Sequence, residues 1–218
     1  MNGGCDIFYD IGDLDNDGRF EIITAGFFIS QLNIIYTDNI QNNFLGGNAK
    51  LITIDSKAGQ LFDVQLDDLD GDNKLEILAT NHQGNKDQVK GALFYYKMQG
   101  SSFKNSTWER FMIYENFPVL KAGINQAAPG AAILFQPNLN DKSGQKYIIL
   151  AGDGAEYAYL FQPNMQPDGS LNYTLVWTQL YKNTVGGISV ADLNGDGYNE
   201  CVIPIYESNT LFFYTFAP

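Results

Sequence analysis

The chain has 218 residues, of which 44% are hydrophobic and 17% charged, a balance that excludes a disordered chain and suffices for a sizeable core. Its net charge is −12 and its only arginines are Arg19 and Arg110, so nucleic acid is excluded as a partner because a phosphate backbone would be repelled. No apolar run approaches membrane-spanning length, so membrane insertion is not expected.

Short apolar and aromatic segments, separated by turns rich in Gly and Asn, predict an all-β chain without helices. The first two groups of strands are expected at about 7–12, 20–28, 32–37, 50–54, and then 61–67, 75–80, 91–97, 108–114. The next two groups are expected at about 131–135, 146–151, 157–161, 173–180, and then 186–191, 200–205, 210–216.

Four strands in each repeat of roughly 50–60 residues are the signature of a β-propeller blade. We therefore predict a β-propeller of four-stranded antiparallel blades, with the last blade lacking its fourth strand. The blades are expected at about 5–57, 58–115, 128–181 and 184–218. Because four blades are few for a closed ring, the chain is expected to form part of a larger propeller.

An acidic motif recurs after the first strand of three of these groups. It reads DLDNDGRFEII from Asp13, DLDGDNKLEIL from Asp68 and DLNGDGYNECV from Asp192. The gap between the second and third copies is about twice the first gap, and a degraded copy beginning at Asn138 fills it. We interpret this degraded unit as a blade that kept its fold and lost its metal.

Calcium takes six to eight oxygen ligands, and each motif offers side-chain oxygens at positions 1, 3, 5 and 9 and a backbone carbonyl at position 7. The position-7 carbonyls belong to Arg19, Lys74 and Tyr198. The predicted side-chain ligands are Asp13, Asp15, Asp17 and Glu21; Asp68, Asp70, Asp72 and Glu76; and Asp192, Asn194, Asp196 and Glu200. About three structural calcium ions are expected, since so many carboxylates in one loop would otherwise repel one another.

Two further positions of the motif test this interpretation. Position 6 requires a positive φ, which Gly18 and Gly197 adopt freely and Asn73 tolerates. An EF-hand would need a bidentate Glu at position 12 and flanking helices. Position 12 is instead occupied by residues without a carboxylate, and the flanks are β-like: Thr24, Ala79 and Ile203.

These three motifs resemble the FG-GAP, or VCBS, repeat, the calcium-binding propeller of integrin α-chain ectodomains. The resemblance implies a propeller with calcium on its blade loops and a typical ring of seven blades, about half of them present here. The segments ILAGDGAEYAYLFQP and NTVGGISVADLNGDGYNE look like the C-terminal part of secreted single-propeller proteins of this repeat type. Asn73 and the unit at Asn138 depart from the family pattern, and the second departure removes the metal from that blade.

Candidate catalytic residues are few, and none is predicted to be catalytic. His82, the only histidine, was weighed as a general base or zinc ligand and is interpreted as a structural residue at a strand end. Trp108 and Trp177 lie in strand-like segments and are expected to pack between sheets rather than bind sugars. The Gly152–Gly154 segment is expected to form a turn.

Two other features bear on the compartment. Cys5 and Cys201 could pair with each other, or either could pair outside this chain. Asn105 and Asn172 begin glycosylation sequons, which fit a secreted protein whose targeting segment is not present in this sequence.

The preferred functional hypothesis is a secreted, non-catalytic binding or adhesion module. Its partner would be an extracellular protein or glycan, contacted by loops on one propeller face. One alternative is a propeller domain of a carbohydrate-active enzyme of lyase or dehydratase type, which rests on analogy between folds alone. Another is a structural subunit of an extracellular assembly, formed by self-assembly or with missing blades from the same precursor.

Overall fold

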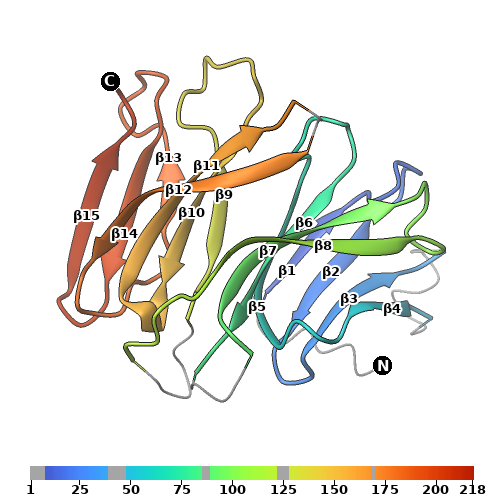
Figure 1. Ribbon diagram of the computed structural model, residues 1–218. Helices are drawn as coiled ribbons and strands as arrows, with labels where there is room; N and C mark the ends of the chain where they lie inside the picture. The colour runs from blue at the N-terminus through green and yellow to red at the C-terminus, as the bar shows by residue number, and fades with distance from the viewer. Residues whose placement is uncertain (1–7, 39–47, 85–88, 122–127, 168–169) are drawn as a thin grey trace.

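The computed structural model describes residues 8–38, 48–84, 89–121, 128–167 and 170–218, and its strands form four antiparallel sheets (Figure 1). In every sheet, strands adjacent in the sequence are hydrogen-bonded neighbours, so each sheet is a simple meander. The first two sheets consist of β1 (Tyr9–Gly12), β2 (Glu21–Gly26), β3 (Gln31–Tyr36), β4 (Lys50–Asp55), and of β5 (Gln60–Asp67), β6 (Glu76–His82), β7 (Ala92–Gln99), β8 (Thr107–Glu115). The others consist of β9 (Ala132–Phe135), β10 (Tyr147–Gly152), β11 (Tyr157–Met165), β12 (Leu171–Leu180), and of β13 (Ser189–Ala191), β14 (Glu200–Ile205), β15 (Thr210–Thr215).

The prediction of an all-β chain is confirmed. Across the described ranges the one helical segment is a single 3₁₀ turn, η1 (Asp153–Ala155). Asp153 and Gly154 thus lie in a turn as expected, whereas Gly152 ends β10. The fourth sheet has three strands, as predicted. The β11–β12 hairpin is longer than expected, because pairing continues past a β-bulge between Leu160 and Phe161 to Met165 and Leu171.

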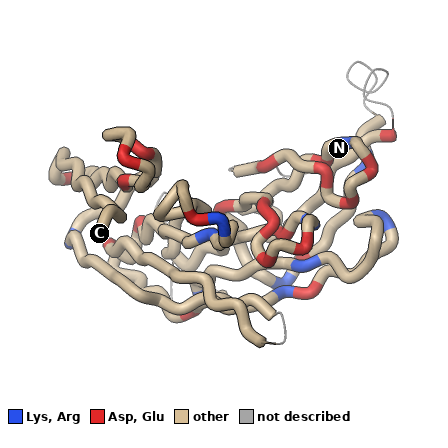
Figure 2. Tube along the Cα trace, turned by 90° about the horizontal axis from the view of Figure 1, so that it is seen from above, with Lys and Arg blue, Asp and Glu red and all other residues tan. Residues whose placement is uncertain are grey.

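The four sheets follow one another in chain order, from the blue sheet to the red sheet in Figure 1. Their first strands lie near each other: β1 contacts β5, β5 contacts β9, and β9 contacts β13. Seen from above in Figure 2, the array carries acidic residues in several separate groups rather than in one run.

The hydrophobic core lies between successive sheets. One cluster joins the first and second sheets, for example Ile34 with Phe94. A second cluster joins the second and third sheets, for example Leu93 with Phe161, and a third joins the third and fourth sheets through Ile149 and Ile203. Each sheet is thus stabilised by burial of apolar faces against its neighbour, rather than within itself.

Side chains connect the first strands of neighbouring sheets. The carboxylate of Asp63 on β5 accepts a hydrogen bond from the backbone N–H of Ala132 on β9 at 2.8 Å. On the other side of β5, the backbone N–H of Leu66 donates to the Asp10 carboxylate on β1 at 2.7 Å. These bonds satisfy backbone groups at strand edges where no further strand pairs.

Asp63 makes the stability of this inter-sheet contact depend on pH. Burial raises the pKa of the Asp63 carboxyl to about 7, and the nearby Asp10 carboxylate adds to the effect, although hydrogen bonds from Ala132 and Val64 oppose it. The unfolded chain loses this proton near its ordinary pKa of 3.8, so the folded state holds the extra proton between those two values. The stability that this proton contributes is complete below about pH 4 and falls as pH rises to about 7.

We expect the unfolding free energy, measured in excess calcium, to decline by on the order of 4 kcal/mol from this group as pH rises through that window. Asp63→Asn, whose amide resembles the protonated acid, should flatten that part of the profile. Asp141→Asn is the control, since the Asp141 carboxyl is exposed and its pKa is lowered by Ser143. Urea melts at several pH values measure the slope, and equal slopes for wild type and Asp63→Asn would contradict the assignment.

Candidate metal centres

The three acidic motifs occupy equivalent places in the fold. Each connects the first strand of a sheet to its second: β1 to β2, β5 to β6, and β13 to β14. Position 12 of every motif lies within the second strand and is buried, so no carboxylate from that position and no helix borders the loop. The exclusion of an EF-hand therefore agrees with the structure.

The first aspartate of each motif closes the loop through backbone hydrogen bonds. In the first loop, Asp13 Oδ1 accepts from Asp17 N at 3.0 Å and Asp13 Oδ2 accepts from Gly18 N at 2.8 Å. Asp68 accepts in the same way from the N–H groups at positions 5 and 6, and Asp192 accepts from the N–H of Gly197 at position 6. The side chain at position 1 thus holds the loop in a tight turn.

The loops need positive φ angles at two positions, not one. Position 6 was predicted to be left-handed, and the prediction is confirmed for Gly18 (84°), Asn73 (62°) and Gly197 (87°). Position 4 is left-handed as well, which the sequence analysis missed: Asn16 (57°), Gly71 (80°) and Gly195 (78°). The recurrence of Asn or Gly at position 4 was the available signal.

The glutamate at position 9 is buried and held in the same way in all three loops. Its Oε2 accepts a hydrogen bond from the backbone N–H of the leucine at position 2. The pairs are Glu21 with Leu14 at 3.1 Å, Glu76 with Leu69 at 2.9 Å, and Glu200 with Leu193 at 2.8 Å. Because one oxygen is committed to the backbone, Oε1 is the oxygen left for other contacts.

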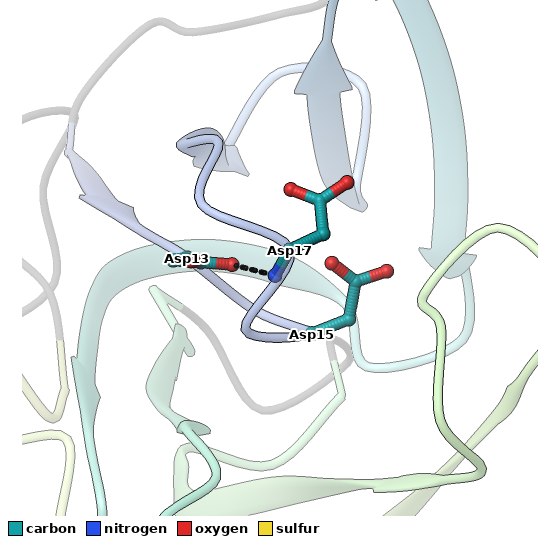
Figure 3. Close-up of side chains that lie close together, drawn as sticks. All are labelled: Asp13, Asp15 and Asp17. Carbon is teal, nitrogen blue, oxygen red and sulfur yellow. Dashed lines mark hydrogen bonds between the residues drawn. The ribbon is translucent and has the colours of Figure 1, made fainter.

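The carboxylates of the first loop converge. Asp13, Asp15 and Asp17 each place a carboxylate oxygen within 4.8 Å of the others (Figure 3). Asp15 Oδ1 is buried and has no hydrogen-bond partner. An orphaned carboxylate oxygen among other carboxylates is costly without a cation, so the oxygen set of this loop fits a hard divalent ion.

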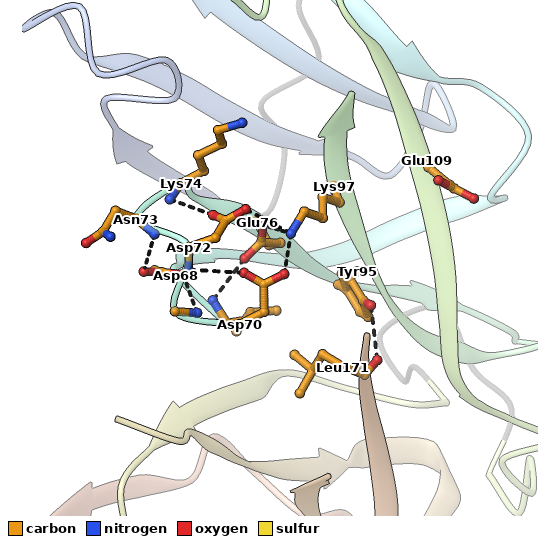
Figure 4. A network of polar contacts seen from close by, with 12 residues as sticks. Asp68, Asp70, Asp72, Asn73, Lys74, Glu76, Tyr95, Lys97, Glu109 and Leu171 are labelled. Carbon is orange, nitrogen blue, oxygen red and sulfur yellow. Dashed lines mark hydrogen bonds and ion pairs between the residues drawn. The ribbon is translucent and has the colours of Figure 1, made fainter. Parts of the chain in front are cut away.

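The second loop converges in the same manner. Asp68, Asp70 and Glu76 place carboxylate oxygens within 4.8 Å of one another, and Figure 4 shows their side chains around a common centre. Glu76 is 1% exposed, and its Oε1 has no hydrogen-bond partner. The donor set therefore fits a divalent cation, although the ammonium of Lys97 also enters this cluster.

The electrostatics of these two loops reflect the crowding of acids. The pKa of Glu21 is raised to about 7, mainly by burial and to a smaller extent by Asp15, Asp17 and Asp13, against the opposing hydrogen bond from Leu14. Burial likewise raises the pKa of Glu76 to about 7, with Asp70 adding to the effect. A divalent cation would reverse this penalty by favouring the ionised carboxylates.

The third loop has the same left-handed backbone positions but one carboxylate fewer. Asn194 replaces the aspartate at position 3, and its Nδ2 donates to Asp196 Oδ2 at 3.1 Å. Glu200 Oε1 accepts from the Thr215 hydroxyl at 3.1 Å. Among the residues described, this loop holds no three acidic groups gathered as closely as in the other two.

The predicted carbonyl ligands occupy position 7, where the structure fixes the backbone. The N–H groups of Arg19, Lys74 and Tyr198 donate to the aspartate at position 5, at 2.9, 2.9 and 2.8 Å. These bonds hold each residue beside the carboxylate cluster. The coordination of a metal by their carbonyl oxygens remains a prediction.

The degraded unit at Asn138 keeps its sheet and replaces the acid at position 9 with a base. Its four strands, β9 to β12, form as expected. Lys146 stands where the other loops have glutamate, and its ammonium pairs with Asp67 of the preceding sheet at 2.9 Å. The loop also contacts its neighbour, since the Leu139 N–H donates to the Gly197 carbonyl at 2.8 Å.

The other candidates have structural surroundings. His82 lies in β6 at 6% exposure, its ring 5.0 Å from that of Phe27, and burial lowers its pKa. Its Nδ1 has no hydrogen-bond partner among the described residues. Trp108 and Trp177 lie in β8 and β12 and pack on the core clusters, as expected.

Residues that bear on secretion lie partly outside the described ranges. Cys201 is buried in β14, whereas Cys5 lies outside the described residues, so their pairing stays open. Asn105 and Asn172, the sequon asparagines, are both exposed. None of the described segments is a helix long and apolar enough to cross a bilayer.

Comparison with known proteins gives a likeness of fold. No family model and no curated protein matches the chain. The chain is similar to the V. cholerae biofilm matrix protein Bap1, with a TM-score of 0.55 and 20% identity over 96% of this chain and 26% of that one. Its similarity to BBS1N in complex with ARL6DN has a TM-score of only 0.36, with 8% identity over 99% of this chain and 82% of that one, and carries no argument. The chain thus spans about a quarter of the length of Bap1 and shares the fold of that part.

Proposed function

We propose that the four sheets are successive blades of a β-propeller. The meander within each sheet and the contacts between successive first strands support this architecture. The blades would occupy about 5–57, 58–115, 128–181 and 184–218, within a larger ring of about seven blades, in line with the resemblance of the loop motifs to FG-GAP or VCBS repeats.

Calcium is the proposed cofactor, bound in the acidic loops at the blade rim. The buried, unpartnered oxygen Asp15 Oδ1 is the observation that carries this proposal, because a buried carboxylate oxygen without a partner is costly unless a cation binds it. The ions would be structural, since each loop draws its ligands from one short segment and ties the first strand of a blade to the second. Calcium would neutralise the carboxylates there and hold the turn.

The proposed function is that of a secreted, non-catalytic module that binds an extracellular protein or glycan. The fold shared with part of a biofilm matrix protein supports an extracellular binding role. His82 is buried and its ring lies against that of Phe27, which supports a structural role for this histidine.

Direct binding assays test this proposal. In calcium, the chain should bind a subset of ligands on a glycan array or a panel of extracellular matrix proteins, saturably and without changing them chemically. The ligand recovered after incubation should be intact by mass spectrometry, as expected of a module that binds without catalysis. Cleavage or elimination products would instead support the carbohydrate-active enzyme, and chain-to-chain assembly without any ligand would support a structural subunit.

A further inference from the structure

The three acidic loops differ in what lies across the sheet from the buried glutamate. In the fourth sheet, Glu200 pairs with Thr215 on the third strand. In the second sheet, Ile77 pairs with Tyr96, so the next pair places Lys97 opposite Glu76. The same step from the pair of Ile22 with Ile35 places Tyr36 opposite Glu21 in the first sheet. A tyrosine, a lysine and a threonine therefore occupy one equivalent position, and only the lysine carries a charge.

Lys97 reaches the carboxylates that would otherwise hold a metal. Its ammonium forms ion pairs with Asp70, with Asp72 at 3.0 Å and with Glu76 at 3.8 Å. Figure 4 shows the lysine entering from β7 toward the same centre on which the acids converge. Three of the four acidic side chains predicted to bind calcium in this loop thus face an ammonium supplied by the protein.

The other two loops have no such cation. Lys50 and Lys104 lie over the Tyr36 ring, at 5.7 and 5.2 Å from its centroid, and form ion pairs with Asp38 rather than with the loop. At the third loop, Thr215 offers a neutral hydroxyl to Glu200. In the part of the chain that the structure describes, no ion pair reaches the carboxylates of the first or third loop from any lysine or arginine.

We propose that Lys97 acts as a tethered cation that takes the place of calcium in the second loop, so that the chain binds two calcium ions tightly, in the first and third loops, and a third only weakly. A divalent ion entering the second loop must displace the ammonium from three carboxylates, and the two cations repel each other if both remain. The ammonium is attached to β7 and loses little freedom on binding, which favours it over a free ion. The inference rests on the proposed calcium role of the loops.

The third unit also carries a lysine near its loop, but with a different partner. Its Lys146, at the position of the glutamate, pairs with Asp67, and its ligand positions 1 and 3 hold Asn138 and Asn140 in place of aspartates. Lys146 therefore makes an ion pair with the neighbouring sheet, whereas Lys97 makes ion pairs with the acids of its own sheet's loop.

Calcium binding by Lys97→Gln provides the test, with calorimetry or a competing fluorescent chelator as the measurement. Wild type should bind two ions tightly, and the variant should bind three, with the affinity of the third raised at least tenfold. Lys57→Gln is the matched control, because it removes the same charge from an exposed residue that precedes β5, at the opposite end from the loop. Its calcium stoichiometry should equal that of wild type.

A second test keeps Lys97 in place, so that its outcome does not depend on whether Lys97→Gln folds. Asp13→Asn should reduce the number of tightly bound ions by one, whereas Asp70→Asn should leave it unchanged. Three equivalent tight sites in wild type, or a loss of one ion in Asp70→Asn, would overturn the role of Lys97 while leaving the calcium role intact. If neither wild type nor Lys97→Gln binds calcium, both proposals fail; if the variant alone binds one ion, the role of Lys97 stands and the wider calcium role fails.

Discussion

Removal of calcium should lower the melting temperature of the chain by about 10–20 °C. A site held at a hundredfold excess of ion over its dissociation constant contributes about 2.7 kcal/mol to the stability of the folded state. Two such sites contribute about 5 kcal/mol, and each kcal/mol shifts the melting temperature by roughly 2–4 °C in a chain of this size. In the first loop, the physical source is the relief of the crowded carboxylates around Glu21.

Thermal melts in calcium, in EGTA, and in EGTA followed by excess calcium measure this shift. Calcium should restore the melting temperature, whereas magnesium should restore it poorly, since magnesium demands octahedral geometry and dehydrates reluctantly. Asp141→Ala, which removes an exposed carboxylate from the degraded loop, should show the same calcium shift as wild type. Identical melts with and without EGTA would refute the metal assignment in every loop.

Truncation of Phe161 should destabilise the chain by about 3–5 kcal/mol, because the ring fills the interface between the second and third sheets. The residue is fully buried on β11, and its ring centroid lies 5.7 Å from that of Tyr114 on β8. Phe161→Ala leaves a cavity that the two sheets can close only by moving together. We expect the melting temperature to fall by roughly 6–20 °C in a calorimetric or circular-dichroism melt.

A surface aromatic gives the matched control for this truncation. Phe213→Ala on β15 removes a ring that is 62% exposed and should change stability by less than about 1 kcal/mol. Phe161→Leu, which keeps most of the buried volume, should fall between the two alanine variants. If Phe161→Ala melted like Phe213→Ala, the interface between the second and third sheets would contribute little to stability.

The strands could be placed from the sequence because each depends on local signals. The acidic motifs mark the turn between the first and second strands, and the apolar run after each motif reads as a strand that is buried on both faces. The expected range of 75–80 became β6, which ends at His82, and the expected range of 186–191 shrank to β13, which begins at Ser189. Such differences arise at strand ends, where the pairing partner decides how far a strand continues.

The predicted ligands converge in the two motifs that are richest in acid. The residues that surround each loop differ, and these contacts cannot be predicted from sequence spacing. Lys97 lies 21 positions after Glu76, and only the register of β6 with β7 places the two side chains together. The left-handed residue at position 4 could have been recognised, since Asn or Gly recurs there. The burial of Asp63 could not have been predicted from the sequence, because it follows from the approach of β9 to β5.

The hydrogen bond from Asn16 Nδ2 to the Asn73 carbonyl, at 3.0 Å, joins the first acidic loop to the second. The first two loops therefore share a side-chain-to-backbone hydrogen bond, and ordering the second loop fixes the acceptor of the first. A Hill coefficient measured for calcium binding to the whole chain will accordingly reflect the coupling between these two loops as well as the intrinsic affinities of the sites. Intrinsic affinities have to be read from Asn16→Gly, which removes the donor side chain and still adopts the left-handed backbone of this position.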